Sequence, residues 1–375
     1  MKPRFYDDPE IWEREVLTSL GLDRQIEVSD LAQHYLEISG HHEDPASPTG
    51  RLRRERSDSS LHLAARGLIF ARRTYLVARH LAPLLTALPE PSSITEVGAG
   101  FAPGLLALGS AEQRLFANEL FPDYRAAWGH LFSAAGLPNP VASLEAAPHL
   151  TGDRAWTLFT YSLYEIAAGR AETAAERIQS LLRNGSSVVV LEPGDSTHAK
   201  FIEEIRDQLA ASELHPVAPC PRTSTCPAAL SGRDWCHFTL RASLGPLATR
   251  ALAVAKRRSQ DLHFSALIYS PLHQMGPGDR VLSVHPEGSQ KMRANLCTPS
   301  GFRRLIALRR HRDAYERLAR LAPFDHIEVS SDAVGKGDGL RISASVQVQA
   351  VEGTGQLVKR EPLRLEPELD QKTGA

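Results

Sequence analysis

The sequence predicts an α/β fold, a Rossmann-like parallel sheet with helices on both faces, preceded by N-terminal helices and interrupted by a cysteine-containing insert. Three observations predict the sheet. From residue 92 onward, apolar strand patterns alternate with amphipathic helix patterns. A glycine-rich turn, EVGAGFAPG, joins the first strand to the next helix. The segment SSVVVLEPG (186–194) is almost entirely apolar, as expected for a strand that is buried on both faces.

The elements follow in order along the chain. We expect an amphipathic helical start, then a long helix or two short ones over 59–88. The predicted strands of the sheet are 92–97, 114–120, a short third one near 140–144, 155–160 and 186–194. The predicted helices between and after them are 123–136, 171–185 and 198–212. Further strands are expected at 264–271, 280–286, 291–297, 326–331 and 340–351.

These elements suggest a division into segments along the chain. We predict, in order, an N-terminal helical region (1–58), a Rossmann-like core (59–213), a Cys-rich insert (214–262), C-terminal strands of the core that carry the fourth cysteine and a basic segment (263–325), and a C-terminal extension (326–375).

Composition and charge exclude several classes of protein. The chain has 375 residues, 42% of them hydrophobic and 23% charged, which excludes wholesale disorder. No apolar run reaches the roughly 18 residues of a membrane span. The net charge of -1 gives no overall attraction to nucleic acid. The first twenty residues are rich in acids, which fits neither a secretion signal nor a mitochondrial presequence, so we expect a cytoplasmic location.

The glycine-rich turn and its acids form a candidate nucleoside site. Gly98 and Gly100 allow a tight turn and close approach of a ligand. Glu96 precedes them, and Glu119 stands at the end of the next strand, where doubly wound folds place a carboxylate against ribose hydroxyls. The spacing differs from the dinucleotide pattern and indicates S-adenosylmethionine. The alternative is a turn that serves the topology alone, with Glu119 as a solvated strand end.

The fourth predicted strand of the core, 155–160, leads into the segment TYSLYEI. This segment lacks the Asp/Asn-Pro-Pro-aromatic tetrapeptide that would orient an exocyclic amine for methylation. Tyr161, Tyr164 and Glu165 lie at that strand end, where packing residues are commoner than catalysts. The sequence therefore identifies no catalytic residue.

The four cysteines indicate a metal site. Cys220, Cys226 and Cys236 show the spacing C-x5-C-x9-C, and Cys297 follows much later. Clustered thiols in a reducing compartment favour metal binding over disulfides. The absence of short C-x2-4-C knuckles favours an iron–sulfur cluster over zinc. Two alternatives stay open, a zinc site completed by His237 or His263, and buried thiols without metal.

Two arginine-rich segments are candidates for phosphate contact. Arg51, Arg53, Arg54 and Arg56 form one, and residues 301–320 contain seven arginines. Arginine attracts the phosphates of RNA in a salt-dependent way. The alternative for each segment is an ordinary solvated face.

Taken together, the segments EVGAG, LEPG, VAPCPRTSTCP, DWCHF, FSALIYSP and NLCTPSGFRR resemble those of the Rsm-type small ribosomal subunit methyltransferase-like family. This family includes mitochondrial ribosome assembly proteins and bacterial proteins described as rRNA methyltransferases. The resemblance covers roughly residues 60–320. The chain departs from the family pattern at Phe101 and Pro103, and at Asp195 and Ser196 after the LEPG segment.

The resemblance implies a specific set of properties. It implies the fold of S-adenosylmethionine-dependent methyltransferases, a [4Fe–4S] cluster held by Cys220, Cys226, Cys236 and Cys297, and the small ribosomal subunit or its rRNA as partner. We therefore expect a cytoplasmic, monomeric, methyltransferase-like protein of ribosome assembly or translation. The alternatives are a non-catalytic assembly factor that keeps the cofactor pocket, and a small-molecule methyltransferase with a zinc site.

Overall fold

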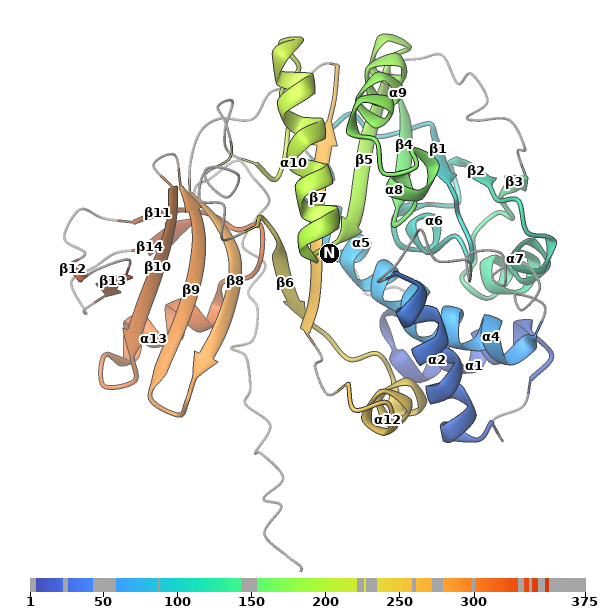
Figure 1. Ribbon diagram of the computed structural model, residues 1–375, viewed down its shortest axis with the longest axis horizontal. Coiled ribbons are helices and arrows are strands. Elements are labelled where there is room, and N and C mark those ends of the chain that lie inside the picture. Colours follow the sequence, from blue (N-terminus) through green and yellow to red (C-terminus); the bar gives the residue numbers. More distant parts are fainter. Residues whose placement is uncertain are drawn as a thin grey trace, which may run out of the picture. The chain divides into compact units, whose positions relative to one another are not determined.

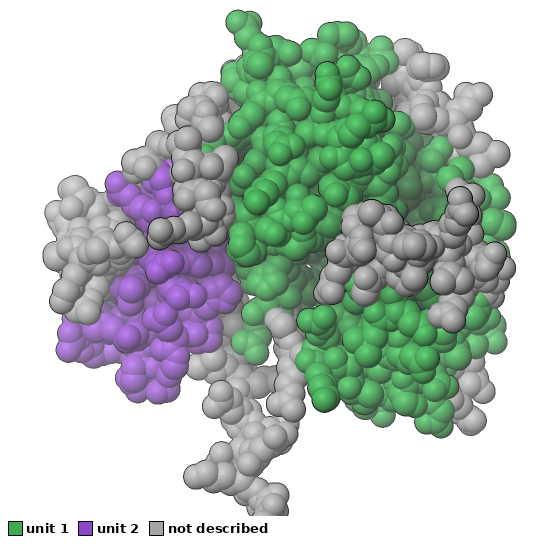
Figure 2. Space-filling view, viewed as in Figure 1, with its two compact units in different colours: residues 1–275 green, residues 276–375 purple. Residues whose placement is uncertain are grey.

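The computed structural model describes residues 5–22, 26–42, 59–86, 88–142, 154–220, 226, 235–257, 261–271, 279–298, 301–329, 334–336, 339–342 and 348–350. The chain divides into two units, residues 1–275 and 276–375 (Figure 2), and each is described by itself. None of the described helices combines the length and the apolar character that crossing a membrane requires.

Helices open the first unit, as the sequence predicts. They are η1 (Phe5–Asp7), α1 (Pro9–Ser19), α2 (Val28–His42), α4 (Ser60–Ala65), the π-helical segment η3 (Arg66–Ala71) and α5 (Arg72–Leu85). Asp8 caps α1, since its side chain accepts the Glu10 and Ile11 amides, and Ser59 caps α4 through the amide of His62. The helix predicted over 59–88 is thus three consecutive helical segments.

A seven-stranded sheet forms the centre of the first unit, in the order β3-β2-β1-β4-β5-β7-β6 (Figure 1). Its strands are β1 (Ser93–Val97), β2 (Arg114–Asn118), β3 (Val141–Ala142), β4 (Ala155–Thr160), β5 (Ser186–Pro193), β6 (Phe238–Arg241) and β7 (Asp261–Tyr269). The first five strands are mutually parallel, and β7 is antiparallel to both β5 and β6. Parallel strands that alternate with helices in this order form a Rossmann-like sheet, so the predicted α/β fold class is confirmed.

Both faces of this sheet are buried. On β5, Val188 and Val190 pack into a hydrophobic cluster with residues of α9 and α10, while Val189 and Leu191 are equally buried on the other side of the strand. This burial explains the nearly continuous apolar pattern of the strand. The helices that follow the first strands are α6 (Pro103–Leu108), α7 (Pro122–Ala134), α8 (Leu163–Ile166), α9 (Ala171–Arg183), α10 (Ser196–Ala211) and α12 (Pro246–Val254).

The second unit has its own sheet, ordered β12-β13-β10-β9-β8-β11-β14. Its elements are β8 (Asp279–Glu287), β9 (Lys291–Thr298), β10 (Gly301–Leu308), α13 (Arg312–Arg320), β11 (His326–Val329), β12 (Val334–Lys336), β13 (Gly339–Ile342) and β14 (Val348–Ala350). Ala314 and Leu318 of α13 pack with Leu296 and Leu305 of the sheet in one hydrophobic core.

The range 263–325, which we predicted to add strands to the core, is split between the two sheets. Its first strand, β7, lies in the central sheet of the first unit, whereas β8, β9 and β10 pair with one another in the second sheet. The strands β7, β8 and β9 are where the sequence predicts them, whereas β10 was not predicted as a strand. Which sheet they join depends on pairing partners far along the chain, and strand periodicity does not encode these partners.

Candidate functional site

The glycine loop leaves β1 at its carboxyl end and opens next to Gly100. Gly98 and Gly100 have φ angles of +67° and +51°, which favour glycine. A Cβ on Gly98 would lie 2.6 Å from the Cβ of Ser162, so this glycine is required for packing. A Cβ on Gly100 would meet none of the described residues within 4 Å. Among the described residues, the loop therefore leaves room for a ligand beside Gly100.

Glu119 contacts this part of the loop directly. Its Oε2 accepts the Gly100 amide at 2.6 Å, and its Oε1 accepts the Phe121 amide at 2.9 Å. The indole of Trp128 donates to the Gly100 carbonyl at 2.8 Å. A carboxylate accepts about four hydrogen bonds, so Glu119 retains acceptor positions for the hydroxyls of a bound ribose. The structure thus brings Glu119 to the loop, and its predicted contact with ribose hydroxyls stays a prediction.

Glu96 has a different environment from the one that the motif suggests. Its side chain is fully buried, and its carboxylate accepts the amides of Gly104 at 3.1 Å and Leu105 at 2.9 Å, together with the hydroxyl of Thr160. Burial raises the pKa of Glu96 to about 7, although these three hydrogen bonds oppose the rise. Glu96 thus fixes the first residues of α6, the helix that follows the glycine loop.

The N-terminal helices pack against the glycine loop. Gly67, in the π-helical segment, lies so close that an added Cβ would be 2.6 Å from Val16 and 3.3 Å from the ring of Phe101. The indole of Trp12 donates to the Gly67 carbonyl at 3.1 Å. Phe101 also meets Tyr124 edge to face, with ring centroids 5.0 Å apart. Phe101, a departure from the family pattern, is therefore a packing residue between the loop and these helices.

The carboxyl ends of β4 and β5 supply further polar groups beside the loop. Ser162 donates to the carbonyl of Val97 at 2.6 Å, which joins the end of β4 to that of β1. Tyr161 has a φ angle of +60°, and burial raises the pKa of its hydroxyl. Glu192 on β5 accepts the Tyr164 amide at 3.0 Å, and burial raises its pKa to about 7. Ligands of open α/β sheets bind at such carboxyl ends.

A histidine–aspartate pair at the start of α10 escaped the sequence analysis. Asp195 caps the helix through the amides of Thr197 and His198, and its Oδ2 lies 2.7 Å from Nδ1 of His198. Burial opposes a charge on His198, but the hydrogen bond and charge of Asp195 outweigh burial and raise the pKa of the imidazole. The ring centroids of His198 and Tyr164 are 4.6 Å apart. The histidine–aspartate pair can hold or transfer a proton.

Three of the four cysteines gather on one face of α10. The Sγ of Cys220 is 3.7 Å from Nη1 of Arg206, and the Sγ of Cys226 is 3.8 Å from Oε1 of Glu203. The amide of Cys236 donates to the same Glu203 oxygen at 3.0 Å. Burial raises the pKa of Glu203 to about 7, an effect that the Cys236 amide opposes and the neighbouring Cys226 reinforces. Sequence analysis did not identify Glu203 and Arg206 as the side chains that contact the cysteines.

The histidines proposed for a zinc site have other neighbours. The Nδ1 atom of His237 is 3.2 Å from the carbonyl oxygen of Trp235. The Nδ1 atom of His263 is 3.0 Å from the hydroxyl oxygen of Thr239. Among the described residues, no group of three potential metal donors within 4.8 Å of one another contains a cysteine. The geometry thus gives no support to a compact zinc site of cysteines with His237 or His263.

Cys297 belongs to the second unit. It is buried in β9, in register with Phe302 of β10 and Arg280 of β8. Because the two units are described separately, the predicted convergence of all four sulfur atoms stays a prediction.

The basic segment of residues 301–320 forms β10 and α13. Arg303 and Arg304 are exposed on the strand, and Arg309 and Arg310 in the turn after it. On α13, Arg312 pairs with Glu316 at 2.8 Å, an exposed pair that contributes little to stability. These arginines face solvent, as either phosphate contact or a solvated surface requires. The cluster Arg51–Arg56 lies outside the described residues.

Comparison with known proteins finds a family that part of this chain resembles. Residues 153–326 match the family Rsm22, described as mitochondrial small ribosomal subunit Rsm22. The match confirms the resemblance predicted from the sequence. No curated protein sequence matches this chain.

Solved structures with similar folds are methyltransferase-like. A cyclopropane-fatty-acyl-phospholipid synthase-like protein from Lactobacillus casei has 14% identity and a TM-score of 0.34, over 55% of this chain and 93% of that one. The human methyltransferase 10 domain containing protein has 10% identity and a TM-score of 0.33, over 54% and 83%. A Bacillus cereus O-methyltransferase in complex with SAH has 11% identity and a TM-score of 0.28, over 70% and 100%.

Proposed function

We propose that this Rsm22-like chain binds S-adenosylmethionine at its glycine loop and acts on the small ribosomal subunit or its rRNA, in ribosome assembly or translation. The observation that carries the cofactor part is the contact between Glu119 and Gly100 beside open space at the loop. The family description supports the ribosomal part. The exposed arginines of β10 and of the turn after it supply the cationic surface that RNA phosphates require.

The residues of the loop have separate tasks in this proposal. Glu119 binds the ribose hydroxyls with its remaining acceptor positions, and Gly100 lets the ligand approach the backbone. Glu96 is a positioning residue, because its carboxylate accepts two backbone amides of α6, the helix that follows the loop. S-adenosylmethionine supplies an electrophilic methyl group when bound. The chain contributes chiefly by fixing the position and orientation of the reactants.

Calorimetric titration with S-adenosylmethionine and S-adenosylhomocysteine tests the cofactor site. Glu119→Gln preserves the size of the side chain but removes its charge. Because hydrogen bonds to a charged group are worth about 1.5–3 kcal/mol, we expect affinity to fall by about 10-fold to 100-fold. Glu112→Gln, which neutralises an exposed acid before β2, is the matched control. Wild-type affinity in Glu119→Gln would contradict the assignment.

The second part of the proposal is a [4Fe–4S] cluster on Cys220, Cys226, Cys236 and Cys297. Its support is the position of three of these cysteines along α10, where Cys220 lies against Arg206 through its Sγ, and Cys226 and Cys236 lie against Glu203 through an Sγ and a backbone amide. With four cysteine ligands the cluster would be structural, and it would stabilise the segment that follows α10.

Iron and sulfide analysis of anaerobically purified protein tests this part. Cys226→Ser replaces a buried thiol and should lose the cluster, its absorbance near 400 nm and much of the soluble protein. Ser187→Ala, a change at another buried position of the first unit, controls for general destabilisation. Full iron content in Cys226→Ser, or a colourless protein with stoichiometric zinc, would refute the cluster assignment.

The alternative function expected from the sequence is a non-catalytic assembly factor that keeps the cofactor pocket. Mapping of rRNA methylation in a deletion strain, with crosslinking of the protein to RNA in cells, separates the two. Loss of a methylated small-subunit position supports the enzyme, whereas cofactor binding and subunit crosslinks without such a loss support the assembly factor.

A further inference from the structure

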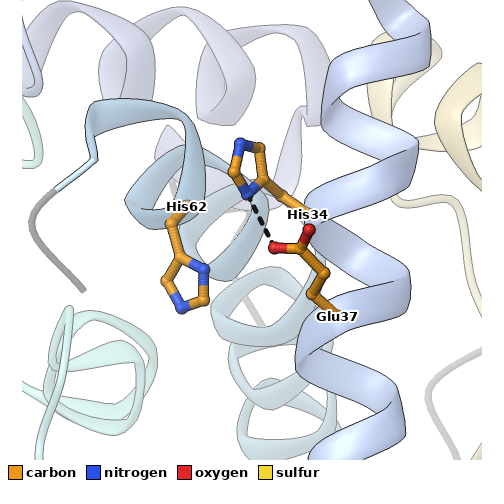
Figure 3. Close-up of side chains that lie close together, drawn as sticks. All are labelled: His34, Glu37 and His62. Atoms are coloured by element: carbon orange, nitrogen blue, oxygen red, sulfur yellow. Dashed lines mark ion pairs between the residues drawn. The ribbon is translucent and has the colours of Figure 1, made fainter. Parts of the chain in front are cut away.

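Three side chains of the N-terminal helices form a cluster of potential metal donors that lies apart from the cysteines. His34 and Glu37 are on α2, and His62 is on α4 (Figure 3). One ligand atom from each lies within 4.8 Å of the other two. The spacing of three residues puts His34 and Glu37 on the same face of α2, and α4 presents His62 to that face (Figure 3).

We propose that His34, Glu37 and His62 bind a zinc ion that links α2 to α4. Two imidazoles and one carboxylate are a donor set that zinc prefers, with the fourth position left to water. Zinc bonds to such ligands are about 2.0–2.2 Å long, so small side-chain rotations must bring the donors closer together around the ion. His34 and Glu37 are each 25% exposed, which gives the ion access from solvent.

The state of His34 supports the proposal. Its Nδ1 is buried and forms no hydrogen bond with any described residue, and the nearest charge is the Glu37 carboxylate at 3.4 Å. A buried polar atom without a hydrogen bond is energetically costly. A zinc ion between this nitrogen and the carboxylate would remove that cost, because Nδ1 would then donate its lone pair to the metal.

Arg66 determines which nitrogen of His62 is available. The Nε of Arg66 donates to Nε2 of His62 at 3.2 Å, so Nδ1 is the ligand atom. When Nδ1 binds zinc, the neutral imidazole carries its proton on Nε2 and must donate there. Arg66 has no acceptor and would have to withdraw. Arg66→Gln offers an acceptor oxygen instead, and should bind zinc about 10-fold more tightly, the low end of effects from groups that orient metal ligands.

Zinc counting on the full-length protein tests the site. Protein stripped with a chelator is dialysed against zinc chloride, and bound zinc is measured by mass spectrometry. Wild type should bind one zinc more than His34→Gln, Glu37→Gln or His62→Gln. The comparison is unaffected by zinc on the cysteines, because all the variants retain them. Asp30→Asn is the matched control, since it removes the same charge from the same helix outside the cluster.

Glu37→Gln is the decisive variant, because it is nearly isosteric and only partly buried, so the fold should survive. Circular dichroism verifies the fold of each variant. Equal zinc content in wild type and Glu37→Gln would overturn the proposal. Unchanged or weaker zinc affinity in Arg66→Gln would overturn the assignment of Nδ1 of His62 as the ligand.

Discussion

Glu96→Gln gives a direct test of the buried carboxyl beneath the glycine loop. In the folded chain the carboxyl of Glu96 has no solvent exposure, and burial raises its pKa from 4.5 to about 7. Because the folded state holds this proton more tightly than the unfolded state, the contribution of Glu96 to stability is fully present below pH 4.5 and is lost as the pH rises through about 7. Glutamine does not titrate.

The magnitude follows from the shift. One pKa unit corresponds to about 1.4 kcal/mol, so a rise from 4.5 to about 7 makes the wild-type free energy of unfolding fall by roughly 3 kcal/mol across this pH range. At low pH, the protonated Glu96 of wild type and the glutamine of the variant each keep one carbonyl oxygen. This oxygen can accept a hydrogen bond from the backbone N–H groups of Gly104 and Leu105. The two proteins should then differ by about one hydrogen bond, roughly 1 kcal/mol.

Urea unfolding of wild type and Glu96→Gln at about pH 4 and about pH 8 measures this effect. We expect the variant to be slightly less stable at the lower pH and to gain roughly 3 kcal/mol relative to wild type at the higher pH. Taking the difference between the two proteins cancels the titration of Glu192 and Glu203, whose pKa values are also near 7. A stability difference that is independent of pH would refute the buried-carboxyl argument.

Two further predictions concern the strand ends and the basic segment. Asp195→Asn removes the hydrogen-bonded charge that outweighs the effect of burial, so the pKa of His198 should fall. In wild type, protonated His198 contributes to stability at low pH, and this contribution is lost as the pH rises through the pKa of His198. The contribution should be smaller in the variant. Titration of the imidazole by NMR measures the change, and an unchanged pKa would argue against the pairing. Arg304→Gln should weaken RNA binding at all sequences and reduce the slope of log affinity against log salt by about 1, if the strand contacts phosphate. Binding measured over a range of salt concentrations tests this, and an unaltered slope would mean that Arg304 belongs to a solvated face.

Local patterns were sufficient to predict the glycine loop and six strands of the first sheet, but not β6, which lies within the predicted insert. The glycines and the helix start after β1 lie within a few residues of one another, so their geometry is set locally. The pairing of Glu119 with Gly100 was also predictable, because β1 and β2 are parallel neighbours whose carboxyl ends meet at one edge.

Other parts of the site were not predictable in this way. The motif puts Glu96 next to the glycines, but only burial under α6 makes it a positioning residue with a raised pKa. The helix at 198–212 was expected, yet the face that meets Cys220 and Cys226 depends on how the following segment packs. Periodicity predicts a helix without specifying the partner that it will contact.

The sequence by itself predicted most of the strands and helices in order, the glycine loop and the cysteines as candidate metal ligands, because these depend on residue type and short-range spacing. Only the tertiary structure decided which distant groups meet. His34 and Glu37 share a helix face by spacing alone, whereas His62 joins them because α2 and α4 pack together. The strands β8 and β9 are likewise visible in the sequence, but their assembly with β10 into a second sheet comes from long-range hydrogen bonding and burial.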